Sequence, residues 1–468
     1  MPQDSWSFLS AVEIARLIRT KAVSPVEIVK DFFARIALQN PALNAYVTLH
    51  EGEAVCAAEK AEQAVMRQQT LSPLHGVPYH VKDNLWVRGS RTTFGSKLQE
   101  TNVTTADCPA VERLRNAGLI LLGRTNTPEY GWKGVTDNRV FGITRNPWNR
   151  ERTPGGSSGG AAAAIAAGMG PIGIGTDGGG SLRIPASCCG IAGFKASFGR
   201  VPNWPGSGGA MLRHIGPMAR TVGDLAATLD VIAGPDDRDL LALPDAGIRW
   251  TDQLNAGIRD TKIAYSANLG YAAVDPEVAA ICRQAAQKLA DSGAHVDEVE
   301  LDWRDPYDAW SVFFFGTAAA AMEAKLDQQG DLLDPGFRRV VEAGRKLRGV
   351  DFANALAARH EFWERVRKTY EQYDLVVCPT LSVPSFAIGQ DDADPIAGEV
   401  LGPLQWTRFT YPFNLTGQSA ASVPAGWTTA GLPVGLQIVG NRFADLLVLQ
   451  AARAWEQIQP WTDKHPPA

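Results

Sequence analysis

The strongest constraint on the fold is a segment crowded with small residues, residues 155–187, which read GGSSGGAAAAIAAGMGPIGIGTDGGGSLRIPAS. Glycine and serine in this proportion are typical of a flexible linker, but here they alternate with alanine, isoleucine, methionine and proline. The alanine-rich run after Ser157 and Ser158 predicts a capped, tightly packed helix, and PIGIGTD predicts a short buried strand. The order loop, helix, strand, loop lets the loops that carry Ser157 and Ser181 face each other.

Length and composition indicate a globular chain. Its 468 residues are 45% hydrophobic and 20% charged, which is enough for one large domain or two to three ordinary ones. The formal net charge is −5, and no block of basic residues of the kind that neutralises phosphates is present. We therefore expect no direct nucleic-acid partner.

The cysteines, the N-terminal residues and the longest uncharged run predict a cytoplasmic protein without a metal site. The 6 cysteines are scattered without CxxC spacing, which fits a reduced cytoplasm better than a disulfide framework or a zinc site. The opening MPQDSWSFLS has neither a basic region nor an apolar core, so we predict no signal peptide. The uncharged run at 153–176 is interrupted by Pro154, Pro171 and many glycines, so no membrane span is expected.

Apolar periodicity predicts helices and strands in mixed order along the chain. Residues 7–40 predict a helical hairpin with Ser10 and Ser24 as N-caps. Further along, predicted helices alternate with short apolar strands such as YDLVVCPT and GLPVGLQIVG. This mixture predicts an α/β fold, a single large domain over residues 1–468 with a mixed central β-sheet covered by helices. Residues 302–370 are expected to form a helical cap.

Three glycine patterns suggest other chemistry for the small-residue segment. Residues 173–178 satisfy GxGxxG, but a dinucleotide site needs an acidic residue about 20 positions later, and none lies between Asp177 and Asp224. No GK[ST] tripeptide follows the glycines, which excludes a Walker phosphate loop. GGSSG around Ser157 matches the nucleophile elbow GxSxG, so a serine hydrolase with a histidine base stays open. The downstream histidines are His214, His295, His360 and His465.

A serine activated by a lysine is a further alternative. A serine hydroxyl is a weak nucleophile that needs a base, and lysine can act as that base only if burial lowers its pKa from about 10.4. Lys82 lies in YHVKDNLW, at the end of an apolar strand, where such burial could occur. The competing interpretation is that Lys82 pairs with Asp83 or extends into solvent.

Six separated motifs follow one another along the chain, and together they cover nearly all of it. They are GVPYHVKDN at 76–84, GRTNTPEYGWKG at 123–134, TRNPWN at 144–149, GGSSGG at 155–160, GTDGGGSLRIPAS at 175–187 and GLPVGLQIVG at 431–440. In order and spacing they resemble the amidase signature family of Ser-Ser-Lys hydrolases. The resemblance implies the amidase signature fold and an amidohydrolase that splits a carboxylic amide into a carboxylic acid and an amine or ammonia, with no cofactor and no metal.

The resemblance also implies a role for each matching residue. Ser181 occupies the position of the nucleophile, Ser157 that of a bridging serine held by a cis peptide bond, and Lys82 that of the base. The implied oxyanion hole consists of the backbone N–H groups of Gly178, Gly179, Gly180 and Ser181. The residues implied to orient the relay and the loop are Ser158, Thr176, Asp177 and Arg183.

Aromatic residues near these motifs suggest the substrate class. By the resemblance, the segment after TNTPE lines the acyl pocket, which makes Tyr130 and Trp132 candidates, with Trp204 behind them. Aromatic walls suit an apolar or aryl acyl group. We therefore expect a small-molecule amide as the substrate, and the same acyl chemistry would serve esters, anilides and carbamates. Ordinary core or rim packing of these rings is the competing interpretation.

Two other functions stay open. The family includes the glutamine-hydrolysing subunit of tRNA-dependent amidotransferases, whose nucleophile loop usually has a polar residue after the arginine. Here Ile184 follows Arg183, and FGRVPNW replaces that subunit's later Tyr-Gly-Arg-Val-Ser-Arg run. A non-catalytic binding subunit would lose one relay member, whereas Lys82, Ser157 and Ser181 are all present. A stand-alone amidase is therefore the leading hypothesis, and a homodimer is left open.

Overall fold

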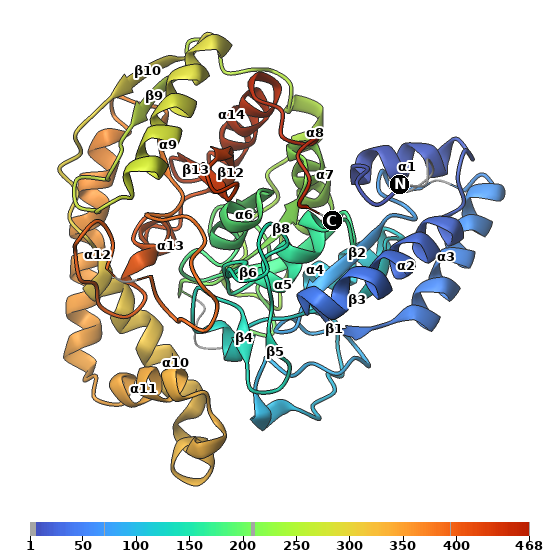
Figure 1. The fold of residues 1–468 in the computed structure, drawn as a ribbon, viewed down its shortest axis with the longest axis horizontal. Coiled ribbons are helices and arrows are strands. Elements are labelled where there is room, and N and C mark those ends of the chain that lie inside the picture. Colours follow the sequence, from blue (N-terminus) through green and yellow to red (C-terminus); the bar gives the residue numbers. More distant parts are fainter. Residues whose placement is uncertain (1–5, 70, 207–210, 394, 468) are drawn as a thin grey trace.

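One large β-sheet runs through the computed structural model, which describes residues 6–69, 71–206, 211–393 and 395–467 (Figure 1). Its strands are β1 (Tyr46–Leu49), β2 (Pro78–Lys82), β3 (Ile120–Thr125), β6 (Ile172–Asp177), β7 (Ala192–Lys195), β8 (His214–Ala219), β9 (Lys262–Tyr265), β10 (His295–Glu298), β11 (Leu375–Pro379), β12 (Ala420–Trp427) and β13 (Pro433–Gly440). A separate small sheet pairs β4 (Asp137–Asn138) with β5 (Gly142–Ile143). In the described part, the large sheet has the order β1-β3-β2-β6-β8-β7-β12-β13-β11-β9-β10.

The large sheet mixes parallel and antiparallel pairs. Strand β2 runs parallel to both β3 and β6, and β9 runs parallel to β10 and β11. The central strands β8, β7, β12 and β13 pair with their neighbours in the antiparallel sense. The predicted α/β fold with a mixed central sheet covered by helices is therefore confirmed.

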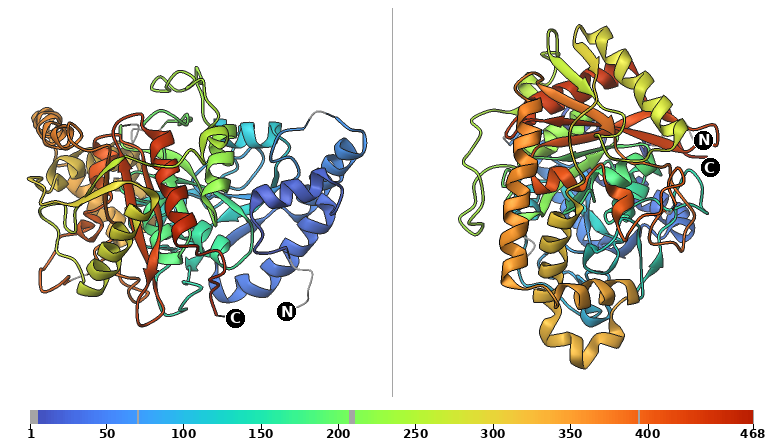
Figure 2. Two further views of the ribbon diagram at one scale, coloured as in Figure 1. Left: turned by 90° about the horizontal axis from the view of Figure 1, so that it is seen from above. Right: turned by 90° about the vertical axis from the view of Figure 1, so that its left-hand side faces the viewer.

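The helices pack around the sheet, and two groups of them lie at its opposite ends. They are α1 (Ala11–Arg19), α2 (Pro25–Leu43), α3 (Glu51–Met66), α4 (Pro109–Asn116), α5 (Gly159–Ala166), α6 (Arg183–Cys189), α7 (Val222–Ile232), α8 (Trp250–Gln253), α9 (Pro276–Lys288), α10 (Tyr307–Gln329), α11 (Pro335–Gly344), α12 (Gly349–Thr369), α13 (Tyr411–Leu415) and α14 (Asp445–Ile458). Figure 2 shows α1–α3 at one end of the molecule and α10–α12 at the other. Helices α10–α12 pack on one another within residues 302–370. The predicted single large domain is confirmed, whereas its bounds at residues 1–468 and the role of these helices as a cap stay predictions.

The first two helices begin where their capping residues predict. The Ser10 hydroxyl accepts a hydrogen bond from the Glu13 backbone N–H at 3.1 Å. Ser24 and Glu27 form a capping box, and Pro25 follows as the first residue of α2. Both predicted N-caps are confirmed.

Helix α5 shows why the central segment is built from small residues. All of its residues are buried, and it packs against α6 and the strands β2, β6 and β8. A Cβ atom on Gly160 would lie 2.4 Å from the backbone nitrogen of Asn126 and 2.7 Å from the carbonyl oxygen of Ala45. Side chains larger than hydrogen therefore cannot occupy this position without moving the backbone of two other segments.

The side-chain cap expected at the start of α5 is wrong. Ser158 is the N-cap residue, but its side chain does not cap the helix. Its hydroxyl donates instead to the carbonyl oxygen of Thr176 at 3.3 Å. The hydroxyl thereby ties the start of α5 to β6, and the first N–H of the helix, that of Gly159, donates to Thr136 Oγ1 at 3.1 Å.

The packing of α5 predicts a contrast between two glycine substitutions. Gly160→Ala should lower the free energy of unfolding by about 1–3 kcal/mol, because the added methyl group must displace backbone atoms. Gly52→Ala in α3 is the matched control, since no atom lies within 4 Å of its added Cβ. That change should stabilise by about 0.5–1 kcal/mol through helix propensity. Urea unfolding checks both variants, and equal midpoints would contradict the close backbone approach at Gly160.

Candidate active site

Two neighbouring parallel strands, β2 and β6, place the sequence motifs side by side at their carboxyl ends. Strand β2 ends at Lys82 and β6 ends at Asp177, and their parallel pairing places both carboxyl ends on the same side. The loop after β6 carries Ser181, and Ser157 lies just before α5. The Ser158 backbone N–H donates to the Ser181 carbonyl oxygen at 3.3 Å, which joins the two serine loops. The region beyond the carboxyl ends of parallel strands is the usual ligand site in α/β folds.

Lys82 is fully buried and contacts two hydroxyl groups. Its Nζ atom is hydrogen-bonded to Ser157 Oγ at 2.6 Å and to Thr176 Oγ1 at 3.0 Å. Burial lowers the pKa of Lys82 well below its ordinary value, and the positive charge of Arg213 lowers it further. The peptide bond between Gly156 and Ser157 is cis. The neutral form of the Lys82 amine is thus favoured next to a serine hydroxyl.

The geometry contradicts two competing interpretations. Asp83 pairs with Arg124 at 3.3 Å, so Lys82 neither pairs with its neighbour in sequence nor extends into solvent. The nucleophile elbow needs a histidine next to Ser157. Among the described residues no histidine is hydrogen-bonded to Ser157, whose hydroxyl contacts Lys82 instead.

The carbonyl groups of the glycine loop are held by residues from distant segments. Trp310 Nε1 donates to the Gly178 carbonyl oxygen at 3.0 Å, and Thr410 Oγ1 donates to that of Gly179 at 2.6 Å. In a trans peptide the N–H points away from the C=O, so the N–H that follows Gly178 points away from Trp310. Gly180 has φ +131°, and a Cβ there would lie 2.3 Å from Thr410 Oγ1, so only glycine fits.

The N–H groups of the same loop fall into two sets. Gly180 N–H donates to Asp177 Oδ1 at 2.7 Å, and Leu182 N–H donates to Asp177 Oδ2 at 3.1 Å. The remaining loop N–H groups have no hydrogen bond within the described ranges, namely those of Gly178, Gly179 and Ser181. The expectation for Gly180 is therefore corrected, because its N–H is already donated to a charged acceptor. The Ser181 hydroxyl likewise has no hydrogen bond to another described residue.

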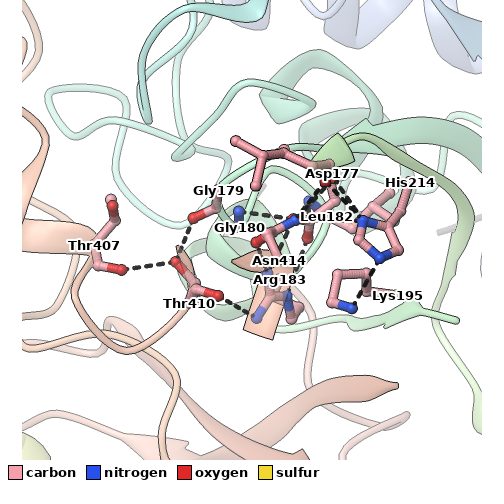
Figure 3. Close-up of polar contacts among 12 residues, drawn as sticks. Asp177, Gly179, Gly180, Leu182, Arg183, Lys195, His214, Thr407, Thr410 and Asn414 are labelled. Carbon is pink, nitrogen blue, oxygen red and sulfur yellow. Dashed lines mark hydrogen bonds and ion pairs between the residues drawn. The ribbon is translucent and has the colours of Figure 1, made fainter. Parts of the chain in front are cut away.

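A buried ion pair supports the loop from below (Figure 3). Arg183 contacts both carboxylate oxygens of Asp177, at 2.9 and 3.0 Å, and neither side chain is exposed. Burial raises the pKa of Asp177, but the charge and hydrogen bonds of Arg183 outweigh it, so the net pKa is below the ordinary value. Arg183 also donates to Asn414 Oδ1 at 2.7 Å, Gln437 Oε1 at 2.7 Å and the Thr410 carbonyl oxygen at 2.9 Å.

Two further buried side chains that can carry a positive charge, Lys195 and His214, lie next to this ion pair. Lys195 Nζ donates to the Gln418 carbonyl oxygen and lies 3.3 Å from His214 Nε2. The other ring nitrogen of His214 contacts the carbonyl oxygens of Leu212 at 2.8 Å and Asp177 at 3.3 Å (Figure 3). Burial lowers the pKa of both Lys195 and His214 well below their ordinary values. Their uncharged forms are thus favoured beneath the loop.

The two serines open onto a cavity of about 500 Å³ with aromatic walls. Tyr130, Trp132 and Trp204 all line it. The Tyr130 ring is stacked on Phe94 and Phe337, with centroids 5.6 and 5.5 Å away. Trp132 is only 5% exposed, so much of its ring serves packing as well as the wall. A cavity of this size and character suits a largely apolar small molecule.

Sequence reasoning missed several residues that shape the site. They are Asn84, Arg213, Trp310, Thr410, Asn414 and Gln437. Gln437 carried a usable signal, because it is a polar residue in the middle of the apolar run GLPVGLQIVG. Asn84 also lay in view, because it ends the motif GVPYHVKDN two positions after Lys82. The remaining four lie outside the quoted motifs and reach the site only through the fold.

Two further features concern the described ranges of the chain. Within them, no helix combines the length and apolar character that crossing a membrane requires. No cluster of three or more histidine, cysteine, aspartate or glutamate side chains suited to a metal ion occurs among these residues.

The buried ion pair predicts unequal effects of two aspartate substitutions. Asp177→Asn should destabilise the protein by about 3–5 kcal/mol, because it leaves the buried Arg183 guanidinium without its counter-charge. Asp331→Asn is the control, since Asp331 forms a 2.9 Å pair with Arg338 at the surface, where its side chain is 99% exposed. Urea unfolding at neutral pH should show a large shift for the first variant and none for the second. Equal midpoints would contradict a stabilising buried pair.

Comparison with known proteins identifies the family. The Amidase family model matches residues 27–449. The chain is 37% identical to an acylamidase of Rhodococcus erythropolis, over 100% of this chain and 98% of the relative, and 33% identical to a glutamyl-tRNA(Gln) amidotransferase subunit of Lachnoclostridium phytofermentans, over 96% and 97%. The crystal structure of a bacterial aryl acylamidase of the amidase signature family superposes with a TM-score of 0.92 at 32% identity, covering 97% of each chain. The chain therefore belongs to the amidase signature family and is an amide hydrolase.

Proposed function

We propose that this chain is a stand-alone amidase that cleaves carboxylic amides through an acyl-enzyme on Ser181, with Ser157 and Lys82 as the proton relay. The observation that carries the proposal is the 2.6 Å hydrogen bond between the buried Lys82 amine and the Ser157 hydroxyl. A lysine whose pKa is lowered by burial can accept a proton. The Ser181 hydroxyl lies in the adjoining loop and lines the cavity.

Acylation follows from this arrangement. Ser181 Oγ attacks the amide carbonyl carbon while its proton passes to Ser157, and the Ser157 proton passes to Lys82. The oxygen that becomes negative accepts hydrogen bonds from the free N–H groups of Gly178, Gly179 and Ser181. Loss of one such donor typically costs about 2.7–4 kcal/mol of transition-state stabilisation. When the C–N bond breaks, the relay runs backwards and protonates the leaving nitrogen, which departs as an amine or ammonia.

Deacylation uses the same groups. A water molecule attacks the acyl carbon and gives up its proton to the relay. The ester bond to Ser181 then breaks, the relay returns that proton to Ser181 Oγ, and a carboxylic acid is released. Thr176 orients the lysine, since its hydroxyl contacts both Lys82 Nζ and Asn84 Nδ2, at 3.0 and 3.1 Å. Ser158 aligns the two serine loops through its backbone N–H. Asp177, with Arg183, fixes the direction of the loop N–H groups.

The cavity supports a preference for apolar or aryl acyl groups. We assign Tyr130, Trp132 and Trp204 to the substrate pocket because their rings line the space next to the two serines. Relatives named acylamidase and aryl acylamidase support this assignment. The same acyl-enzyme chemistry would accept esters, anilides and carbamates of similar shape.

Glutamine hydrolysis within an amidotransferase complex is the second candidate, favoured by relatives such as the Lachnoclostridium protein. Glutamine carries an α-ammonium group that needs a negative partner. Among the described residues that line the cavity, none is an aspartate or glutamate. A purified chain that hydrolyses an acyl anilide but not glutamine would favour the amidase, and the reverse result would favour the amidotransferase role.

Covalent labelling tests the proposed nucleophile. A fluorophosphonate should add its mass to Ser181, and Lys82→Ala should slow the labelling about 10²–10⁴-fold, which is the usual contribution of a general base. Ser382→Ala is the matched control, because Ser382 is buried outside the cavity and its hydroxyl has no hydrogen-bond partner among the described residues. Peptide mapping by mass spectrometry locates the adduct. An adduct on Ser157, or labelling independent of Lys82, would overturn the proposed relay.

The lowered pKa of Lys82 predicts the pH dependence of turnover. Only the neutral amine can accept the Ser157 proton, so kcat/KM should rise about tenfold per pH unit below the pKa of Lys82 and level off above it. Because burial lowers that pKa well below 10.5, the plateau should begin well below pH 10.5. The measurement is kcat/KM for a neutral acyl anilide between about pH 5 and pH 10. A rate that keeps rising to the alkaline limit would mean that Lys82 is an ordinary charged lysine.

A further inference from the structure

The cavity at the two serines has an unbalanced charge. Its described lining residues include the cations Lys133, Arg213 and Lys325 but no aspartate or glutamate. Lys133 is neutralised from outside the cavity, since its Nζ atom lies 3.0 Å from Asp137 and 2.5 Å from Asp391. Lys325 and Arg213 are both partly exposed, but the Arg213 Nε atom is buried and has no hydrogen-bond partner in the described part of the chain. Arg213 therefore carries the positive charge that the cavity leaves least compensated.

The guanidinium group of Arg213 has few hydrogen-bond partners, and no carboxylate next to it, in the described part of the protein. Its Nη2 atom donates to the Asn84 carbonyl oxygen at 3.2 Å, and its Nε atom is buried without a hydrogen-bond partner among the described residues. No carboxylate of the described chain lies within 4.0 Å of its guanidinium group. Arginine stays protonated in proteins, and a shielded charge without a partner is unfavourable. A guanidinium held in this way is well suited to an anionic group supplied by a ligand.

The contacts of Arg213 connect it to the relay, and therefore to the leaving-group half of the substrate. Arg213 contacts the backbone of Asn84, whose side chain donates to Thr176 Oγ1 at 3.1 Å, and Thr176 in turn contacts Lys82. The proton that Lys82 stores returns through Ser157 to the leaving nitrogen. The amine therefore departs next to the relay, and the contacts through Asn84 and Thr176 connect Arg213 to Lys82 in that relay.

Building on the amidase function proposed above, we propose that Arg213 binds a carboxylate on the leaving-group half of the substrate. The preferred substrates are then amides whose amine product carries a carboxylate, such as N-acyl amino acids and N-acyl aminobenzoates. The planar guanidinium matches a carboxylate through two parallel hydrogen bonds. Trp86 and Trp204, which line the cavity with ring centroids 5.9 Å apart, supply apolar surface for the carbon skeleton between the amide and the carboxylate.

A matched pair of substrates tests this proposal. N-Hexanoyl-4-aminobenzoate and N-hexanoyl-4-aminoacetophenone share the acyl group and the ring, and they differ in whether the para group is charged. The protein should favour the benzoate in kcat/KM by about tenfold or more, as expected for a charged hydrogen bond. Arg213→Gln should remove that preference mainly through KM, and Arg213→Lys should retain part of it, since lysine keeps the charge but loses the planar fork.

Three further outcomes separate the proposal from its competitors. Arg338→Gln makes the same chemical change on the exposed surface and should leave the preference intact. If Lys325→Gln removes the preference and Arg213→Gln does not, the carboxylate is bound elsewhere and the proposal is overturned. If Arg213→Gln lowers kcat/KM equally for both substrates, Arg213 acts only on the fold or on Lys82, and the proposal is also overturned.

The pH dependence of kcat distinguishes carboxylate binding by Arg213 from a purely structural role, which would affect both substrates alike. Arg213 helps to keep the pKa of Lys82 low. A substrate carboxylate next to Arg213 offsets part of that positive charge, so the pKa of Lys82 should rise. The acid limb of kcat for the benzoate should then lie at higher pH than that for the acetophenone. The two limbs should coincide in Arg213→Gln, and coincidence in the unmodified protein would count against the proposal.

Binding without turnover separates this inference from the proposed function. In the Ser181→Ala variant, calorimetry should show tighter binding of the benzoate than of the acetophenone, and adding Arg213→Gln should equalise the two. If neither compound is hydrolysed by the unmodified chain but this difference in binding is found, the proposed function fails and the carboxylate site stands. If both compounds are hydrolysed through Ser181 and bind equally well to the variant, the carboxylate site alone is wrong.

Discussion

The bidentate ion pair between Asp177 and Arg183 is the interaction on which the site depends. Asp177 uses one oxygen for the N–H of Gly180 and the other for that of Leu182, so a single carboxylate fixes both sides of Ser181. Arg183 connects that carboxylate to α13 and β13, which lie more than 200 positions later in the chain. The loop is thus held by its backbone. The side chain of Ser181 takes no part in these hydrogen bonds, so its hydroxyl is available to a substrate.

The small residues of the central segment have a geometrical purpose. The relay needs a lysine from β2, a serine before α5 and a serine before α6 within hydrogen-bonding distance of one another, which requires two loops and a helix to approach closely. The contacts at Gly160 show how little room remains, since a single added carbon would meet two backbone segments. Alanine and glycine therefore bring the backbones together, and the hydroxyl of Ser158 then ties α5 to β6 in place of capping the helix.

The sequence was sufficient for the fold class, and it placed Lys82 at the end of one strand and Ser181 in the loop after the neighbouring strand. Lys82 contacts Ser157, and Ser157 and Ser181 line the same cavity. Thr410 could not be foreseen, because it contacts Gly179 across 231 positions and only the order of strands in the sheet brings the two together. The hydrogen bond from the Gly180 N–H to Asp177 could not be predicted either, since it depends on the direction of one carboxylate and not on residue type.

Burial alone does not make a lysine a base, as the two fully buried lysines next to the nucleophile loop illustrate. Both Lys82 and Lys195 have pKa values that burial lowers well below the ordinary range. Lys195 faces the Gln418 carbonyl oxygen and His214, and neither residue is among those that line the cavity. Lys82 faces a serine hydroxyl that lines the cavity. In the relay proposed above, the partner of the amine, and not the size of its pKa shift, therefore distinguishes the lysine that accepts a proton from the structural one.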